Sequence, residues 1–398
     1  MQKPSRVVLK RDKDFIVFIE DGKKKFRSGK YNYDFDLEHG FFARWGGSFD
    51  DDPTWSPFGP EILDFEITTQ CSGIDGNLCK YCYKSNTHKG ENTSYETFKS
   101  VIEKINYNQQ LTQVAFGLGS TAEENLDLWD MCDYLRRNHI IPNGTVAQVD
   151  ERTAMKIAEN FGAVAVSYHD DFKVLGDTVR NLHTARNQAG TNSRLRQINI
   201  HFMIAEETFE DCKKLFQFII EKSPKLTGIN AVVLLGLKKC GRATKFNYNR
   251  ISDEHFEELV KMAFANNIGI GFDSCSANRF EETVTKMTEK KCQEIADDMY
   301  EDNVGMDEQI AKEIADEKKK LQDMLMLIEP CESGLFSSYV NVKGNYYPCS
   351  FYEQLPEAEH FVVPGNDFES HWSNQCSQMN DWRHKLRSSK RSCPIYAV

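Results

Sequence analysis

Residues 62 to about 275 alternate between short runs of strand-forming residues and longer stretches with helical periodicity. The strand-like runs are rich in β-branched and aromatic residues, and they span 62–69, 112–117, 145–149, 163–168, 197–204, 229–235 and 268–273. The helical stretches span 94–106, 122–138, 150–160, 172–188, 206–222 and 252–265. Strands that alternate with helices pair in parallel, because each helix carries the chain back across the sheet. The alternation therefore predicts an α/β fold with a partial or full (β/α) barrel of the TIM type.

The segments on either side of this region have a different character. Near the N-terminus, two strand-like runs flank Asp21-Gly22, which is a hairpin signal. After residue 276 the chain is charged and helical, and from Cys331 it changes to a short hairpin with a turn at Gly344-Asn345. We therefore expect a β-rich segment, a barrel, a helical connector and a small C-terminal domain, with boundaries at 1–60, 61–276, 277–330 and 331–398.

Composition narrows the class of protein. Of the 398 residues, 40% are hydrophobic and 27% are charged, as in ordinary globular domains. There is no apolar run of about 18 residues and no basic-then-apolar leader, so we expect a cytoplasmic protein without a membrane segment. The net charge of −11 repels phosphate backbones, which disfavours nucleic acid as the substrate.

Three of the twelve cysteines, Cys71, Cys79 and Cys82, lie in the loop after the first strand-like run. Cytosolic reductants keep thiols reduced, so clustered cysteines point to metal or cluster ligation instead of disulfides. Three thiolates can hold three corners of a four-iron cluster and leave the fourth iron open. A structural zinc knuckle and unligated core cysteines are the alternatives, although zinc sites usually show two paired half-sites and no fourth ligand stands near.

A second group of cysteines lies near the C-terminus. Cys331 and Cys349 stand on either side of the predicted hairpin, so pairing of its strands brings the two thiols to one end. Cys393 is a natural third ligand, and either Cys376 or Cys275 is the fourth. This set predicts one further four-iron cluster, with a zinc site as the alternative.

The first motif resembles that of the radical S-adenosylmethionine (SAM) enzymes. Their signature is three cysteines after the first barrel strand, closing in C-x-aromatic-C, which Cys79-Lys-Tyr-Cys82 matches. Seven residues separate Cys71 from Cys79, where most members have three. The second group is similar to the SPASM/Twitch domains that hold auxiliary clusters in these enzymes. It has the same spacing: twelve residues separate Cys331 from Gly344, and four more separate Gly344 from Cys349.

The resemblance also implies positions for the cofactor. Tyr81, between two of the cysteines, would pack on it. Gly117 and Gly119 match the glycines of a Gly-Gly-Glu-type segment that holds the methionine amino group, with Ser120 or Glu123 in place of the glutamate. An ordinary strand–helix turn is the alternative interpretation of this segment.

Further candidates lie at or near the ends of later strands. Ser167 matches a strand-end serine near the cofactor carboxylate or ribose, and His169 and Asp170 are candidates for substrate contact or proton transfer, unless an aspartate here only caps the next helix. His201 joins the site if it points inward and is otherwise a structural histidine. Cys275 is a candidate hydrogen-atom donor, a ligand to the second cluster, or a buried thiol.

These features imply a specific chemistry if the resemblance holds. A [4Fe-4S] cluster with one open iron binds SAM, and an electron from an external donor of the flavodoxin or ferredoxin type cleaves it to a 5′-deoxyadenosyl radical that abstracts a hydrogen atom. The auxiliary [4Fe-4S] cluster binds substrate or accepts an electron. We expect a ribosomally made peptide or protein as substrate, with oxidation or cyclisation of a small molecule or nucleoside as the alternative. A zinc-stabilised binding protein without catalysis is the alternative from another class.

Overall fold

The computed structural model describes residues 6–301, 307–326, 328–356, 358, 368–373, 377–389 and 392–395. Its first part is an antiparallel five-stranded sheet in which every strand pairs with the next. The strands are β1 Val7–Arg11, β2 Phe15–Glu20, β3 Lys23–Ser28, β4 Asn32–Asp36 and β5 Phe42–Trp45. The predicted hairpin is confirmed: Asp21 and Gly22 join β2 to β3 with φ of 52° and 71°, the positive angles that a tight hairpin turn needs.

The second part is a nine-stranded sheet with the order β12-β11-β10-β9-β8-β7-β6-β13-β14. Its parallel strands are β6 Ile62–Glu66, β7 Gln113–Gly117, β8 Ile141–Val146, β9 Ala163–Ser167, β10 Gln197–Ile204, β11 Ala231–Gly236 and β12 Ile270–Phe272. This arrangement confirms the predicted α/β class with a mostly parallel sheet. In the described part of the chain, β12 and β14 form the two edges, so the sheet stays open and the barrel is partial.

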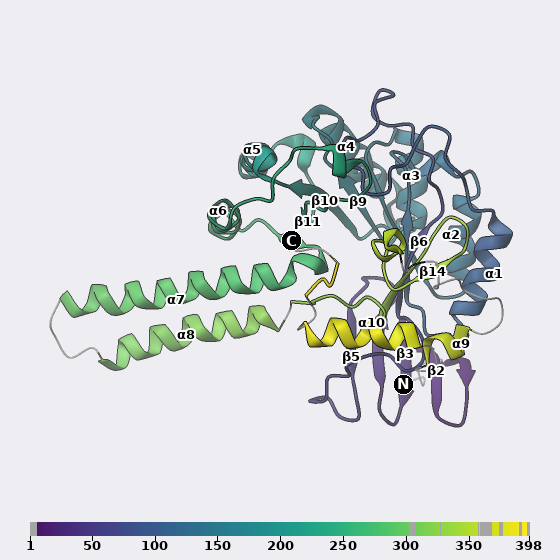
Figure 1. Cartoon of the computed structure of the whole chain (residues 1–398), viewed down its shortest axis with the longest axis horizontal. Coiled ribbons are helices and arrows are strands. Elements are labelled where there is room, and N and C mark those ends of the chain that lie inside the picture. Colours follow the sequence, from purple (N-terminus) through teal and green to yellow (C-terminus); the bar gives the residue numbers. More distant parts are fainter. Residues whose placement is uncertain are drawn as a thin grey trace.

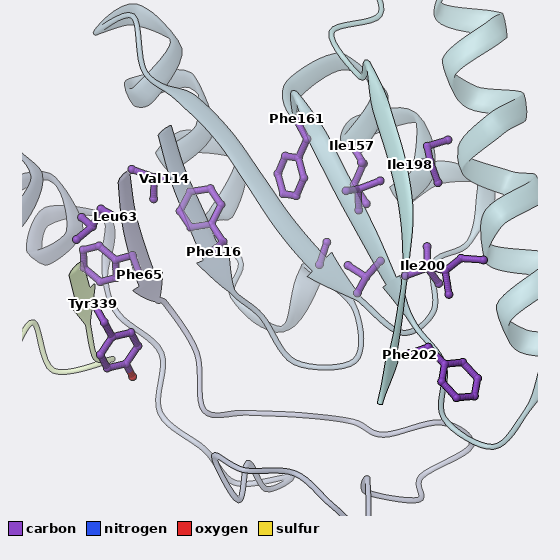
Figure 2. Packing of buried hydrophobic residues seen from close by; sticks show 14 of the residues in the cluster. Leu63, Phe65, Val114, Phe116, Ile157, Phe161, Ile198, Ile200, Phe202 and Tyr339 are labelled. Carbon is purple, nitrogen blue, oxygen red and sulfur yellow. The ribbon is translucent and has the colours of Figure 1, made fainter. Parts of the chain in front are cut away.

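Helices cover one face of this sheet (Figure 1). They are α1 Tyr95–Ile105, α2 Leu128–Arg137, α3 Glu151–Asn160, α4 Phe172–Ala189, α5 Phe209–Ile220 and α6 Asp253–Ala265. Apolar side chains alternate along the strands, and those on the helix side form the main core, including Phe65, Phe116 and Phe202 (Figure 2). Polar residues at helix starts fix several ends; Ser94, for example, accepts a hydrogen bond from the Thr97 amide.

Two predicted elements have different bounds in the structure. The third strand runs over Ile141–Val146 and not 145–149, because its Pro142-Asn-Gly144 segment pairs with β7 despite a low intrinsic strand preference. The helix predicted over 122–138 is two elements, a 3-10 turn at Ala122–Glu124 and then α2. Similar short 3-10 turns occur at Gly190–Asn192, Glu206–Thr208, Pro224–Leu226, Gly241–Lys245, Ser274–Ser276 and Tyr352–Gln354.

After β12 the chain forms a long helical hairpin and then returns to the body. Helices α7 Ala277–Glu301 and α8 Asp307–Leu325 lie side by side and extend away from the sheets (Figure 1). Strands β13 Ser337–Val340 and β14 Tyr346–Tyr347 form the predicted C-terminal hairpin, and β13 also pairs in parallel with β6. The last helices are α9 Phe368–Trp372 and α10 Ser377–Ser388. In the described ranges, no helix combines the length and the apolar character needed to cross a membrane.

Candidate active site

The structure places Cys71, Cys79 and Cys82 in the loop between β6 and α1, at the C-terminal ends of the parallel strands. All three thiols are half-buried and none forms a disulfide. Burial raises the pKa of the Cys79 thiol to about 12, and Cys82 adds to the effect. The loop starts from a fixed geometry, because the Cys71 amide donates to the carbonyl of Thr87 at 2.9 Å.

Glu124 holds the start of this loop from the end of β7. Its carboxylate accepts hydrogen bonds from the amide and hydroxyl of Ser72, at 3.0 and 2.9 Å, and from the amide and hydroxyl of Ser120, at 3.1 and 2.9 Å. Gly119 is required here, because a Cβ at that position would stand 2.4 Å from the carbonyl oxygen of Gln70. Sequence reasoning missed Glu124, although Thr121-Ala-Glu-Glu124 has the spacing of a capping box, which the structure forms.

Glu123, which with Ser120 was one of the two residues expected in place of the motif glutamate, forms ion pairs with helix α3. Its carboxylate pairs with Lys156 at 2.9 Å and Arg152 at 2.8 Å, both on α3. The hydrogen bond from Lys156, opposed by partial desolvation, lowers the pKa of Glu123. Of the expected residues in this segment, Gly117 and Ser120 do approach the first loop region: Gly117 packs against the backbone of Glu66, and Ser120 bonds Ser72.

Arg242, from the turn after β11, holds the other end of the loop. Its guanidinium Nε donates to the carbonyl of Cys79 at 2.9 Å, and its amide donates to the carbonyl of Cys82 at 3.0 Å. Gly241 has a φ of +56°, and a Cβ there would meet the Cys82 carbonyl at 2.6 Å. Gln148, after β8, also donates to the carbonyl of Gly73 at 2.8 Å. Contacts from several strand ends therefore fix the backbone that carries the three thiols.

An aromatic pair lies beside the cysteines. The Tyr81 ring stacks on His169, with centroids 5.9 Å apart and planes at 21°, and its hydroxyl donates to the carbonyl of Tyr168 at 3.1 Å. Burial lowers the pKa of His169, so its imidazole is neutral at pH 7. The Nδ1 atom of His169 is buried and has no hydrogen-bond partner among the residues that the structure describes. A buried polar atom without a partner is costly, so Nδ1 retains an unused capacity for one hydrogen bond.

The residues around His169 in the sequence make different contacts. Asp170 has a φ of 57° and its carboxylate lies 3.3 Å from the ammonium of Lys80, inside the cysteine motif. The cap of α4 is Asp171, whose side chain accepts from two amides of the first turn. Ser167 is the last residue of β9, and the structure places it opposite His201 of β10.

His201 and Asp64 lie on the inner face of the sheet. The neighbours of each along its strand, such as Ile200 and Phe202, point into the helix-covered core, so these two side chains point the other way. Burial lowers the pKa of His201 to about 4, an effect that Asp273 partly opposes. Asp64 is in contact with solvent, yet crowding by surrounding atoms raises the pKa of its carboxyl to about 6.

Four thiols of the second group influence one another's titration: Cys275, Cys331, Cys349 and Cys393. Burial raises the pKa of Cys349 to about 12, and Cys331 and Cys393 add to the shift. A hydrogen bond with Cys393 and then burial raise the pKa of Cys275, so these two thiols are in contact. Of the two candidates for the fourth ligand, Cys275 stands in this group and Cys376 lies outside the described residues.

Neither group has the compact arrangement of a single-ion site. In the part of the chain that the structure describes, no three His, Cys, Asp or Glu side chains are gathered closely enough to hold one metal ion. A four-iron cluster binds each cysteine to a different iron, so its ligands stand further apart than those of one zinc ion. Both thiol groups, with soft donors on fixed backbone, fit the chemistry of such a cluster.

Comparisons with known proteins show the fold. No protein-family model matches the sequence, and a search of curated proteins finds no match. The structure of Streptococcus suis SuiB matches with a TM-score of 0.50 and 12% identity, over 83% of this chain and 68% of SuiB. The chain shares the fold of SuiB.

Two further solved structures match less well. The structure titled native anSMEcpe with bound AdoMet has a TM-score of 0.45 and 15% identity, over 85% of this chain and 92% of that one. BtrN in complex with AdoMet and 2-DOIA has a TM-score of 0.36 and 10% identity, over 83% and 91%. Both titles name AdoMet as a bound molecule.

Proposed function

We propose that this protein is a radical SAM enzyme that carries one auxiliary iron–sulfur cluster. The observation that supports this most directly is the loop after β6, where three half-buried thiols without disulfides stand at the C-terminal ends of a parallel sheet. The fold shared with SuiB agrees with this interpretation. Cys71, Cys79 and Cys82 would hold the first [4Fe-4S] cluster, and Cys275, Cys331, Cys349 and Cys393 the second.

The chain's own residues supply position and environment. When bound, the first cluster and SAM supply a radical that removes a hydrogen atom from the substrate. Glu124 and Arg242 keep the two ends of the cysteine loop in place. The unpartnered Nδ1 of His169 and the stacked ring of Tyr81 offer a hydrogen bond and a flat apolar surface beside the thiols. His201 stays neutral at pH 7 because burial lowers its pKa to about 4, so it faces the substrate region as an uncharged donor or acceptor.

We infer a ribosomally made peptide or protein as the substrate, with an external flavodoxin- or ferredoxin-type protein as the electron donor. The acidic balance of the chain, 60 acidic against 49 basic residues, suits a basic partner and disfavours nucleic acid. Within this proposal, residues 61–276 form the barrel and 331–398 the auxiliary-cluster domain, joined by the helical connector at 277–330.

Anaerobic reconstitution with iron and sulfide, followed by SAM and dithionite, tests the proposal through formation of 5′-deoxyadenosine. The wild-type chain should be brown and hold roughly eight irons. Cys82→Ala should abolish 5′-deoxyadenosine formation, and Cys292→Ala, a half-buried cysteine on α7 outside both groups, should not. A colourless protein that binds zinc, or a Cys82→Ala variant that still cleaves SAM, would refute the assignment.

A further inference from the structure

Side-chain contacts join two segments that are far apart in the sequence. Residues 83–84 directly follow Cys82 of the first group, and residues 350–354 directly follow Cys349 of the second group. We call these two segments and the contacts between them the junction. The rings of Tyr83 and Phe351 lie 4.9 Å apart, and the Gln354 side chain donates to the carbonyl of Tyr83 at 3.0 Å. The ammonium of Lys84 lies 2.5 Å from the carboxylate of Glu353. Residues 271 positions apart are thus held together next to Cys82 and Cys349.

Lys84 is the centre of the junction. Besides Glu353, its ammonium lies 3.3 Å from the carboxylate of Glu66, at the end of β6, and donates to the hydroxyl of Tyr339 on β13 at 2.5 Å. The Tyr339 hydroxyl in turn donates to Glu66 at 2.9 Å. The side chains of Lys84 and Glu66 are only 11% and 5% exposed. Charges so far from water persist only when they are paired and hydrogen-bonded, which fixes their positions.

This arrangement connects the first cysteine loop to the C-terminal segment. Lys84 stands two residues after Cys82, and two residues of chain span at most about 7 Å, so a fixed ammonium fixes the end of the loop. Its partners Tyr339 and Glu353 belong to the C-terminal segment that carries Cys331 and Cys349. The loop that holds the first three thiols therefore takes part of its shape from residues near the other end of the chain.

We propose that Lys84 is a positioning residue through which the C-terminal segment sets the geometry and the reduction potential of the first cluster. The inference rests on the proposed function, because it requires a cluster at Cys71, Cys79 and Cys82. Lys84, paired with the carboxylates of Glu66 and Glu353, lies two residues along the chain from Cys82. Removing the ammonium should make addition of an electron to the cluster harder, and removing one carboxylate should make it easier, because charges in a poorly hydrated region are weakly screened.

Full-length, anaerobically reconstituted protein tests this inference by redox titration of the first cluster's electron paramagnetic resonance signal. Lys84→Met should shift its potential downward and Glu353→Gln should shift it upward, relative to wild type. Simple loosening of the loop would move both variants in the same direction. Lys84→Arg should restore the wild-type potential, and Lys89→Met, an exposed lysine of the same loop, should leave it unchanged.

The rate of 5′-deoxyadenosine formation gives a second readout. Lys84→Met should lower kcat/KM for SAM at least tenfold and Glu353→Gln about threefold, although Glu353 lies far from the loop in sequence. If the wild type forms no cluster or no 5′-deoxyadenosine, the proposed function itself fails. If the wild type is active and both variants match Lys89→Met in potential and rate, the inference is wrong while the proposed function stands. Should Lys84→Met not fold, the sign of the Glu353→Gln shift decides alone.

Discussion

Removal of the Glu124 carboxylate should weaken SAM binding strongly, because this side chain holds the residue next to Cys71. Glu124→Ala deletes the two hydrogen bonds from Ser72, at 3.0 and 2.9 Å. Hydrogen bonds to a charged group contribute about 1.5–3 kcal/mol each. Both bonds to Ser72 are open to solvent, so we take about 2–3 kcal/mol for the pair together. At about 1.4 kcal/mol for each factor of ten, this corresponds to roughly a 30- to 140-fold effect.

The assay is the dependence of 5′-deoxyadenosine formation on SAM concentration in reduced, reconstituted protein. A loop that spends less time in its competent shape lowers apparent affinity by that fraction, so the change should appear in KM for SAM. The matched control is Glu123→Ala, the adjacent glutamate, whose partners Arg152 and Lys156 are on the surface of α3. Its KM should stay within about twofold of wild type, since surface ion pairs contribute little. Equal KM values for the two variants would show that β7 does not hold the cysteine loop.

Three further predictions concern other parts of the molecule. Lys24 is fully buried, and desolvation lowers its pKa from 10.5 to about 7. Between these two pH values the unfolded state binds more protons than the folded state. The free energy of unfolding should therefore rise with pH, by about 1 kcal/mol from pH 7 to 8. In urea unfolding measured over this pH range, Lys24→Met should lose this rise in the free energy of unfolding. If the variant keeps the pH dependence of the wild type, the prediction is wrong. Iron analysis should show that Cys275→Ala loses the iron of the second cluster and that Cys376→Ala keeps it. The reverse pattern would make Cys376 the fourth ligand. Gly241→Ala should lower first-cluster occupancy, because its Cβ would meet carbonyl oxygens at 2.2 and 2.6 Å, whereas Gly29→Ala has free space and should have no effect.

The sequence predicted the elements whose signals are local. Alternating apolar residues place the strands from β6 to β12 in the correct order, and Asp21-Gly22 places the first hairpin. Prediction failed where a neighbour overrides local preference, as in Pro142-Asn-Gly144, which forms a strand because β7 and β9 stand on either side.

The candidate site was predictable in its thiols and not in what surrounds them. Cysteine spacing is a property of one segment, so the sequence alone singles out the three thiols that the structure places in the first loop. Arg242 and Lys84 act on that loop through contacts with segments far away along the chain, and no short-range pattern announces such contacts. The sequence singled out Glu123 and not Glu124 for a related reason, because only the turn geometry decides which of the two carboxylates faces Ser72.

The pairing of β13 with β6 has a consequence for synthesis of the chain. Tyr339 leaves the ribosome 273 residues after Glu66, which at about 5–20 residues per second is a delay of roughly 14–55 s. During that time one side of β6 displays unpaired amide and carbonyl groups shortly before three free thiols in the chain. An open strand edge is a template for unwanted association, so nascent chains that stall before residue 337 should aggregate or recruit chaperones far more than finished ones.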